Sequence, residues 1–178
     1  MSAVRRTPAR GAARRVRLAT ALVLLAAAAV AGALPGCDSY FFYPTKGDLP
    51  NPALEGVARE DVFFRAPDGV TLHGWLLRPE GTPLGTVLFL HGNAENVSTH
   101  VNAVLWLVRS GYRVFLFDYR GYGRSEGSPT MAGVHLDALA AIDALFGMKE
   151  VDGDRIVVLG QSLGGAVAVY AVAHSPHK

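Results

Sequence analysis

The chain has 178 residues, a length that suits one globular domain. Half of the residues are hydrophobic and 18% are charged, which excludes a disordered or fibrous chain, and a single cysteine excludes a disulfide scaffold or a zinc site built from several thiolates. Six of the 17 basic residues are arginines before Leu18 and no acid precedes Asp38, so residues 37–178 carry a formal charge of −4. A mildly acidic body without a basic cluster argues against a nucleic-acid partner.

Residues 1–36 have the pattern of a secretory signal peptide. The arginines precede an alanine-rich apolar run of 17 residues, Leu18 to Leu34, which is shorter than the roughly 20 residues of a spanning helix. The sequence Leu34-Pro35-Gly36-Cys37 resembles a bacterial lipobox, with proline where a small residue is usual. That resemblance implies a lipid on Cys37, and a lipoprotein anchored in the cell envelope, facing the periplasm or the exterior. An uncleaved N-terminal anchor and plain secretion are the alternatives.

Residues 37–58 are expected to form an extended tether, because prolines and glycines interrupt them and they show no regular hydrophobic period. They include an aromatic patch, Tyr40 to Tyr43. This patch can pack on the domain or lie at the lipid interface, and packing is favoured because large aromatic side chains are mostly buried.

A domain of alternating strands and helices is expected over residues 59–178. Strands at 61–66 and 70–78, joined by the turn Pro67-Asp68-Gly69, predict a β-hairpin. Further on, continuous apolar runs predict strands covered on both faces, and apolar residues at helical spacing predict helices. These strands are expected at 86–90, 113–117 and 155–159, and the helices at 96–109, 129–146 and 163–174. The order predicts an α/β domain with a mostly parallel sheet.

Two stretches, Gly123–Gly127 and Gly160–Gly164, fit the pattern G-x-S-x-G. This pattern is typical of a nucleophile elbow, in which a strand enters, a helix leaves and the serine occupies the strained corner. Ser162 has that context, whereas Ser125 has no strand directly before it and is interpreted as part of a glycine-rich loop. The sequence therefore predicts Ser162 as a catalytic nucleophile, and a tightly packed helix start is the alternative reading.

A serine nucleophile needs donors that hold the developing oxyanion. The backbone N–H of Leu163 is one candidate, because it lies at the positive end of the leaving helix. The other is expected in the loop after strand 86–90, where Gly92 lets the N–H of Asn93 point at the substrate. We interpret the His91 ring as a brace for this loop rather than as the catalytic base.

Three segments together resemble the serine-hydrolase branch of the α/β-hydrolase superfamily, in the group described as serine-aminopeptidase-like or depalmitoylase-like. They are His91–Asn96, Asp118–Ser125 and Gly160–Gly165. The similarity covers about residues 59–178. It implies Ser162 as the nucleophile, Asn93 and Leu163 as backbone oxyanion donors, and hydrolysis of an ester, thioester or amide through an acyl-enzyme. It also implies that the loop 118–127 is mainly structural and lies near the rim of the pocket.

The chain departs from that family after the nucleophile, because the triad order in this fold is nucleophile, acid, histidine. Only 16 residues follow Ser162, and they contain no Asp or Glu. His174 would lie roughly 18 Å along the helix axis from Ser162, so neither it nor His177 can be the base. The triad acid and base are thus expected to be missing, together with the later strands. A fragment or incomplete gene model, a frameshifted relic, and a short protein completed by a partner are the three explanations.

Two functional hypotheses follow. The first is a membrane-anchored serine hydrolase, acting on a small-molecule or acyl substrate and inactive as this chain alone. The second is a non-catalytic lipoprotein that uses the half-sheet for binding or assembly. No cofactor or metal is expected, because the sequence has no phosphate-binding loop or dinucleotide fingerprint, and Asp152 and Asp154 flank a glycine as in a solvated turn. Asp118 is interpreted as hydrogen-bonded within its loop.

Overall fold

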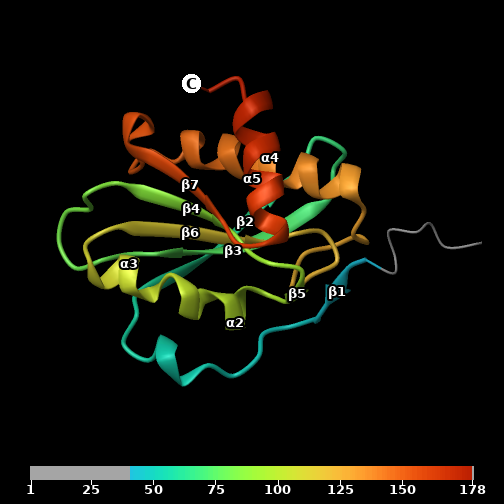
Figure 1. The fold of residues 1–178 in the computed structure, drawn as a ribbon. Helices are drawn as coiled ribbons and strands as arrows, with labels where there is room; N and C mark the ends of the chain where they lie inside the picture. The colour runs from blue at the N-terminus through green and yellow to red at the C-terminus, as the bar shows by residue number, and fades with distance from the viewer. Residues whose placement is uncertain (1–40, 178) are drawn as a thin grey trace, which may run out of the picture. The chain divides into compact units, whose positions relative to one another are not determined.

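The computed structural model describes residues 41–177 as a five-stranded sheet with helices on both faces (Figure 1). The strands lie in the order β2-β3-β6-β4-β7. They are β2 (Arg59–Arg65), β3 (Thr71–Leu77), β4 (Thr86–Leu90), β6 (Arg113–Asp118) and β7 (Ile156–Gly160). The predicted α/β fold and its hairpin are confirmed. The sheet is mixed, because β4 pairs in parallel with β6 and β7, while the pairings of β2 with β3 and of β3 with β6 are antiparallel.

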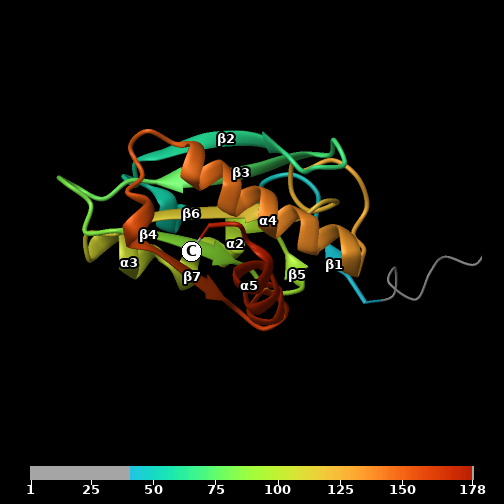
Figure 2. The ribbon, with the colours of Figure 1, turned by 90° about the horizontal axis from the view of Figure 1, so that it is seen from above.

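The helices divide between the two faces of the sheet. Figures 1 and 2 show α4 (Met131–Gly147) and α5 (Leu163–His174) on one face, and the short helices α2 (Val97–His100) and α3 (Leu105–Arg109) on the other. No helix within residues 41–177 is long and apolar enough to cross a membrane. The signal peptide expected at 1–36 and the lipidation expected at Cys37 lie outside the described residues.

Each face of the sheet has its own hydrophobic core. On β4, Leu88 and Leu90 belong to the cluster under α4 and α5, and Val87 and Phe89 belong to the cluster under α2 and α3. Successive side chains of a strand point to opposite faces, so two covered faces require a run that is apolar throughout. The apolar runs in the sequence therefore predicted these central strands correctly.

Two helices differ from the sequence-based expectation. The helix expected over 96–109 is divided into α2, a 3₁₀ turn at Val101–Ala103 and α3. Four of its six buried apolar positions are valines, whose β-branched side chains favour a continuous helix only weakly. The next helix begins at Met131 instead of Pro129, because the Thr130 side chain caps it and accepts a hydrogen bond of 3.0 Å from the Gly133 N–H.

Residues 41–58, expected to belong to an extended tether, pack against the domain. The short strand β1 (Tyr43–Pro44) pairs in parallel with β5 (Ala94–Glu95). The aromatic patch divides, since Phe42 is buried while Phe41 and Tyr43 are exposed. Backbone hydrogen bonds to β5 hold this stretch although its sequence has no regular hydrophobic period.

The loop after β6 is fastened by a buried arginine. Arg120 Nη2 donates to Asp137 Oδ1 of α4 at 2.8 Å, and its backbone N–H donates to Asp137 Oδ2 at 2.8 Å. Its Nη1 donates to Asp68 Oδ2, in the turn of the hairpin, at 2.7 Å. One guanidinium thus ties the loop to α4 and to the β2–β3 turn, and a buried charge of this kind is tolerated only when it is paired.

In the described part of the chain, β7 pairs only with β4, so its outer edge is open. Val157 on β7 and Val169 on α5 are 59% and 73% exposed. Because an open apolar edge invites pairing with other chains, we expect the purified 178-residue chain to aggregate. The double variant Val157→Lys, Val169→Lys should lower the aggregated fraction by roughly half or more, as measured by size-exclusion chromatography with light scattering.

Leu84 provides the matched control for that experiment. It is 58% exposed and lies in the loop between β3 and β4, outside both β7 and α5. Leu84→Lys should leave the aggregated fraction unchanged. A monodisperse monomer of the unmodified chain would show that this edge is not adhesive.

Candidate active site

Ser162 occupies a sharp bend between the end of β7 and the start of α5. Its backbone angles are φ 53° and ψ −116°, a conformation that a non-glycine residue adopts only under strain. In the described part of the chain, Glu95, in the loop after β4, is the other non-glycine residue with positive φ. Ser162 is exposed. The structure therefore places its hydroxyl on the strand–turn–helix bend that the sequence predicted.

The glycines on either side of Ser162 are required by close backbone contacts. A Cβ on Gly160 would lie 2.2 Å from the carbonyl oxygen of Gly164. A Cβ on Gly164 would lie 2.0 Å from the carbonyl oxygen of Leu90, at the end of β4. Both separations are far below van der Waals contact, so no side chain fits at either position. The bend thus rests directly on the end of the neighbouring strand.

The loop after β4 runs beside this bend. A Cβ on Gly92 would lie 3.7 Å from the carbonyl oxygen of Gln161 and 3.9 Å from Ser162 Cβ, and the Gln161 N–H donates to the Leu90 carbonyl at 3.0 Å. Within residues 41–177, the backbone N–H groups of Asn93 and Leu163 donate to no protein acceptor. One such amide thus directly follows the exposed Ser162, and the other lies in the loop that runs beside the bend.

Side chains that no motif singled out hold this loop in place. The Tyr122 hydroxyl donates to the Asn93 carbonyl at 2.5 Å and lies 3.0 Å from Asn93 Oδ1. The His100 ring bridges loop and bend, with Nε2 2.8 Å from the Ala94 carbonyl oxygen and Nδ1 3.0 Å from Gln161 Oε1. Tyr122 belongs to a segment that the resemblance marked as structural, whereas nothing in the sequence pointed to His100.

The His91 ring lies fully buried inside the loop. Its Nδ1 is 2.7 Å from the Gly92 carbonyl oxygen, and the ring packs 4.5 Å from the Tyr119 ring, centroid to centroid. Burial lowers the pKa of His91 to about 3, so the ring is neutral and Nδ1–H donates to that carbonyl. This geometry agrees with the bracing role expected for His91.

Asp118 is buried beside His91 at the end of β6. Its Oδ1 accepts a hydrogen bond of 2.9 Å from the Val97 N–H and lies 3.6 Å from His91 Nε2. Burial raises the pKa of Asp118 to about 7. The carboxyl group therefore links the loop after β6 to the first residue of α2, as a structural residue would.

The other candidates are placed away from Ser162. The Ser125 hydroxyl is buried and already hydrogen-bonded. It donates to the Asp118 carbonyl at 2.6 Å and accepts from the His73 N–H at 2.9 Å. His174 contacts the Tyr170 carbonyl in the last turn of α5. His177 Nε2 lies 3.0 Å from Asp143 Oδ1. Residues 41–177 thus bring together a serine and two amide donors, and they place no histidine in hydrogen-bond contact with that serine.

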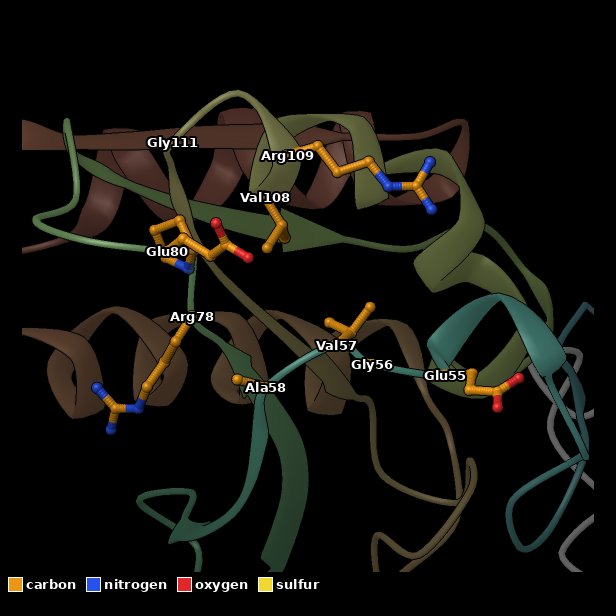
Figure 3. Close-up of a pocket in the computed structure, with 10 residues that line it drawn as sticks. Glu55, Gly56, Val57, Ala58, Arg78, Glu80, Val108, Arg109 and Gly111 are labelled. Atoms are coloured by element: carbon orange, nitrogen blue, oxygen red, sulfur yellow. The ribbon is translucent and has the colours of Figure 1, made fainter.

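A pocket within the described residues lies away from Ser162. It has a volume of about 430 Å³ and is lined by residues 55–58, the segment after β3 and the end of α3 (Figure 3). This is the end of the sheet at which β6 begins, whereas Ser162 follows the end of β7. The Arg78 guanidinium at its margin is already paired with Glu60 and Glu150. The pocket lacks a convergent set of free polar groups, and no group of three or more potential metal ligands occurs within residues 41–177.

Substitution of the two glycines that follow Leu163 should give opposite results. Gly164→Ala should destabilise the fold by about 3 kcal/mol or more, because the new methyl group meets the backbone of β4. Gly165→Ala is the control, because a Cβ there is no closer than 3.6 Å to another residue and alanine favours the helix. Urea unfolding followed by circular dichroism measures both. Equal stabilities would contradict the close contact described for Gly164.

His91 and Asp118 should each make the stability of the fold depend on pH, but their two effects cancel in the unmodified chain. Between about pH 4 and 6.5 the folded pair holds one proton, on Asp118, and the unfolded pair also holds one, on His91, so their contributions to stability cancel. In Asp118→Asn only His91 remains, and the unfolded state then binds the additional proton. Stability of this variant should fall by about 1 kcal/mol for each pH unit of acidification below pH 6.5, relative to the unmodified chain.

Urea unfolding at several values across that range, monitored by tryptophan fluorescence, measures the difference between the two proteins. Comparison with the unmodified chain removes the contribution of the exposed carboxylates, which both proteins share. Parallel pH profiles would show that the two buried groups do not hold the assigned protons.

Comparison with known proteins agrees with this geometry. A profile of the family described as alpha/beta hydrolase fold matches residues 85–178. The chain is 43% identical over 140 residues to the protein YfhR of Salmonella typhi, covering 75% of this chain and 46% of YfhR. It is 40% identical over 129 residues to the alpha/beta hydrolase domain-containing protein WAV2 of Arabidopsis thaliana, covering 71% of this chain and 42% of WAV2. The chain thus spans about half the length of these relatives.

Solved structures give the same result. The esterase Pf2001 of Pyrococcus furiosus is 26% identical, with a TM-score of 0.65 over 77% of this chain and 54% of the esterase. An acetyl xylan esterase from Paenibacillus sp. R4 is 26% identical, with a TM-score of 0.59 over 72% of this chain and 49% of that enzyme. Sequence profile, relatives and fold agree, and the chain belongs to the α/β-hydrolase family.

Proposed function

We propose that this chain is the nucleophile-bearing part of a membrane-anchored serine hydrolase that cleaves an ester, thioester or amide. The observation that supports this most strongly is the strained bend, which exposes Ser162 beside the unpaired N–H groups of Asn93 and Leu163. Esterases among the structural neighbours support the same reaction class. The lipobox-like sequence ending in Cys37 supports the anchor.

In the proposed reaction, Ser162 Oγ attacks the carbonyl carbon of the substrate and its proton passes to a general base. The carbonyl oxygen becomes an oxyanion, held by the N–H groups of Asn93 and Leu163, the latter at the positive end of α5. Collapse of this intermediate breaks the bond to the leaving group, which takes the proton from the base, and leaves an acyl-serine. Water then attacks the acyl-serine while the base takes a proton from the water. The bond to Ser162 Oγ breaks, the base returns the proton to Oγ, and the acid product leaves.

The general base and its acidic partner are proposed to come from outside the described residues. His174 and His177 make other contacts at the far end of α5, and the buried His91 braces its own loop. The relatives have about twice the matched length, which leaves room for both groups in their other half. The 178-residue chain alone is therefore proposed to be a poor catalyst.

A non-catalytic lipoprotein is the second candidate. The observation that favours it is the open apolar edge of β7, which offers a site for another strand. Under this alternative the bend at Ser162 would be inherited geometry without turnover.

Joining the chain to the second half of YfhR tests the two candidates. Residues 1–178 followed by the part of YfhR beyond the matched region should hydrolyse p-nitrophenyl esters, because the second half would supply the acid and base. Ser162→Ala in this chimera should lower the rate by roughly a thousandfold or more. Without the added half, the chain should hydrolyse these esters no faster than its own Ser162→Ala variant.

Ser125→Ala is the matched control, because it alters the other G-x-S-x-G serine and should keep most of the activity of the chimera. A folded chimera that shows no Ser162-dependent hydrolysis would favour the non-catalytic alternative. Circular dichroism verifies that the chimera is folded.

A further inference from the structure

Residues 41–51, which we call the strap, cross the loop after β4 close to Ser162. The strap begins at Phe41, whose carbonyl oxygen accepts a hydrogen bond from Asn93 Nδ2. β1 within it pairs with β5, and both views of the ribbon show these two strands side by side (Figures 1 and 2). Asn96 then holds the strap by donating from Nδ2 to the Thr45 and Gly47 carbonyl oxygens at 3.0 and 2.6 Å. The first described residues therefore lie on the loop that supplies a proposed oxyanion donor.

The covalent chain limits how far this loop can lie from a lipid on Cys37. Three residues separate Cys37 from Phe41. Four Cα–Cα steps of a fully extended chain span at most ~14 Å. The Asn93 side chain is hydrogen-bonded to the Phe41 carbonyl, and Gly92 lies against Ser162. A lipid on Cys37 would thus hold the loop within about half the thickness of a hydrocarbon core from the membrane surface.

The strap presents side chains that suit this position. Phe41 is 48% exposed and Tyr43 is 65% exposed, although Phe42 between them is buried. Tyr and Trp side chains are enriched where a protein meets the lipid headgroups, because their rings are amphipathic, and the exposed Phe41 ring adds apolar surface beside Tyr43. The strap also carries Lys46 and Asp48, of opposite charge, so it does not repel an anionic surface as an acidic segment would.

We propose that the face formed by the strap and the loop after β4 lies against the lipid bilayer, so that the candidate active site opens toward the membrane surface. This inference rests on the anchoring that is part of the proposed function. A long tether would leave the orientation of the domain free, whereas a link of three residues that leads into a hydrogen-bonded strap limits which face can meet the lipid. The partner is the bilayer itself, contacted by the exposed rings of Phe41 and Tyr43.

Fluorescence quenching by the lipid tests this orientation. The lipidated full chain, purified from a bacterial membrane, is placed in vesicles of phosphatidylethanolamine and phosphatidylglycerol that contain a spin-labelled lipid. Tyr43→Trp reports from the strap, in a Trp106→Phe background that removes the exposed native tryptophan and leaves the buried Trp75. Leu84→Trp in the same background is the matched control. Quenching at position 43 should be at least about threefold stronger than at position 84.

A spacer tests whether the short link is the cause. About 20 glycine and serine residues inserted between Cys37 and Phe41 extend the link to a root-mean-square length of roughly 25 Å, and should bring the quenching at position 43 down toward that at position 84. Unchanged quenching with the spacer would contradict the role of the link.

Mass spectrometry of Cys37 separates the two possible failures. If Cys37 carries a lipid and positions 43 and 84 are quenched equally, the orientation is wrong while the anchoring stands. If Cys37 carries no lipid, the anchoring itself fails and the orientation argument fails with it.

Discussion

The close approach of three backbone segments at the end of β7 is the constraint on which the site depends. Gly160 and Gly164 leave no room for a Cβ, so the chain turns there within van der Waals distance of β4. The turn holds Ser162 in a strained backbone conformation at an exposed position. It also starts α5 next to the loop after β4, which is why two unpaired amides and one hydroxyl lie together. The geometry of the proposed active site follows from backbone packing and not from a network of side chains.

Polar contacts then fix the loops that this packing brings together. Arg120 ties the loop after β6 to α4 and to the hairpin turn, and Tyr122 from the same loop holds Asn93. His91 and Asp118 lie beneath them as a buried pair that needs no net charge. The paired members of this network favour one arrangement, because breaking them would leave polar groups unpaired in a region of low dielectric constant, while His91 Nε2 and Asp118 Oδ2 have no hydrogen-bond partner within the described residues.

Much of this architecture could be predicted from the sequence. Continuous apolar runs identified the central strands, since only a strand covered on both faces needs them, and the glycine spacing identified the bend at Ser162. The division of the helix expected over 96–109 was not predictable, because propensity is weak in a valine-rich segment and packing decides. The roles of Tyr122 and His100 could not be predicted from the sequence. Each depends on a contact with a residue more than 25 positions away, Asn93 for Tyr122 and Gln161 for His100. The packing of residues 41–58 could not be predicted from a hydrophobic period, because main-chain hydrogen bonds and the Asn96 side chain hold this stretch.

The strap also has a consequence for the order of folding. Its partners in the domain lie 47 to 79 residues further along the chain, as for Asn51 with the Ser98 carbonyl and Lys46 with the Ser125 carbonyl. A chain exported from its N-terminus delivers the strap first and these partners much later. In a chain exported as the proposed signal peptide implies, the strap would therefore wait unpaired until β4 and the loop after β6 have emerged and closed a large loop. Export would then be coupled to assembly of the proposed site, and this early segment would be among the last to pack.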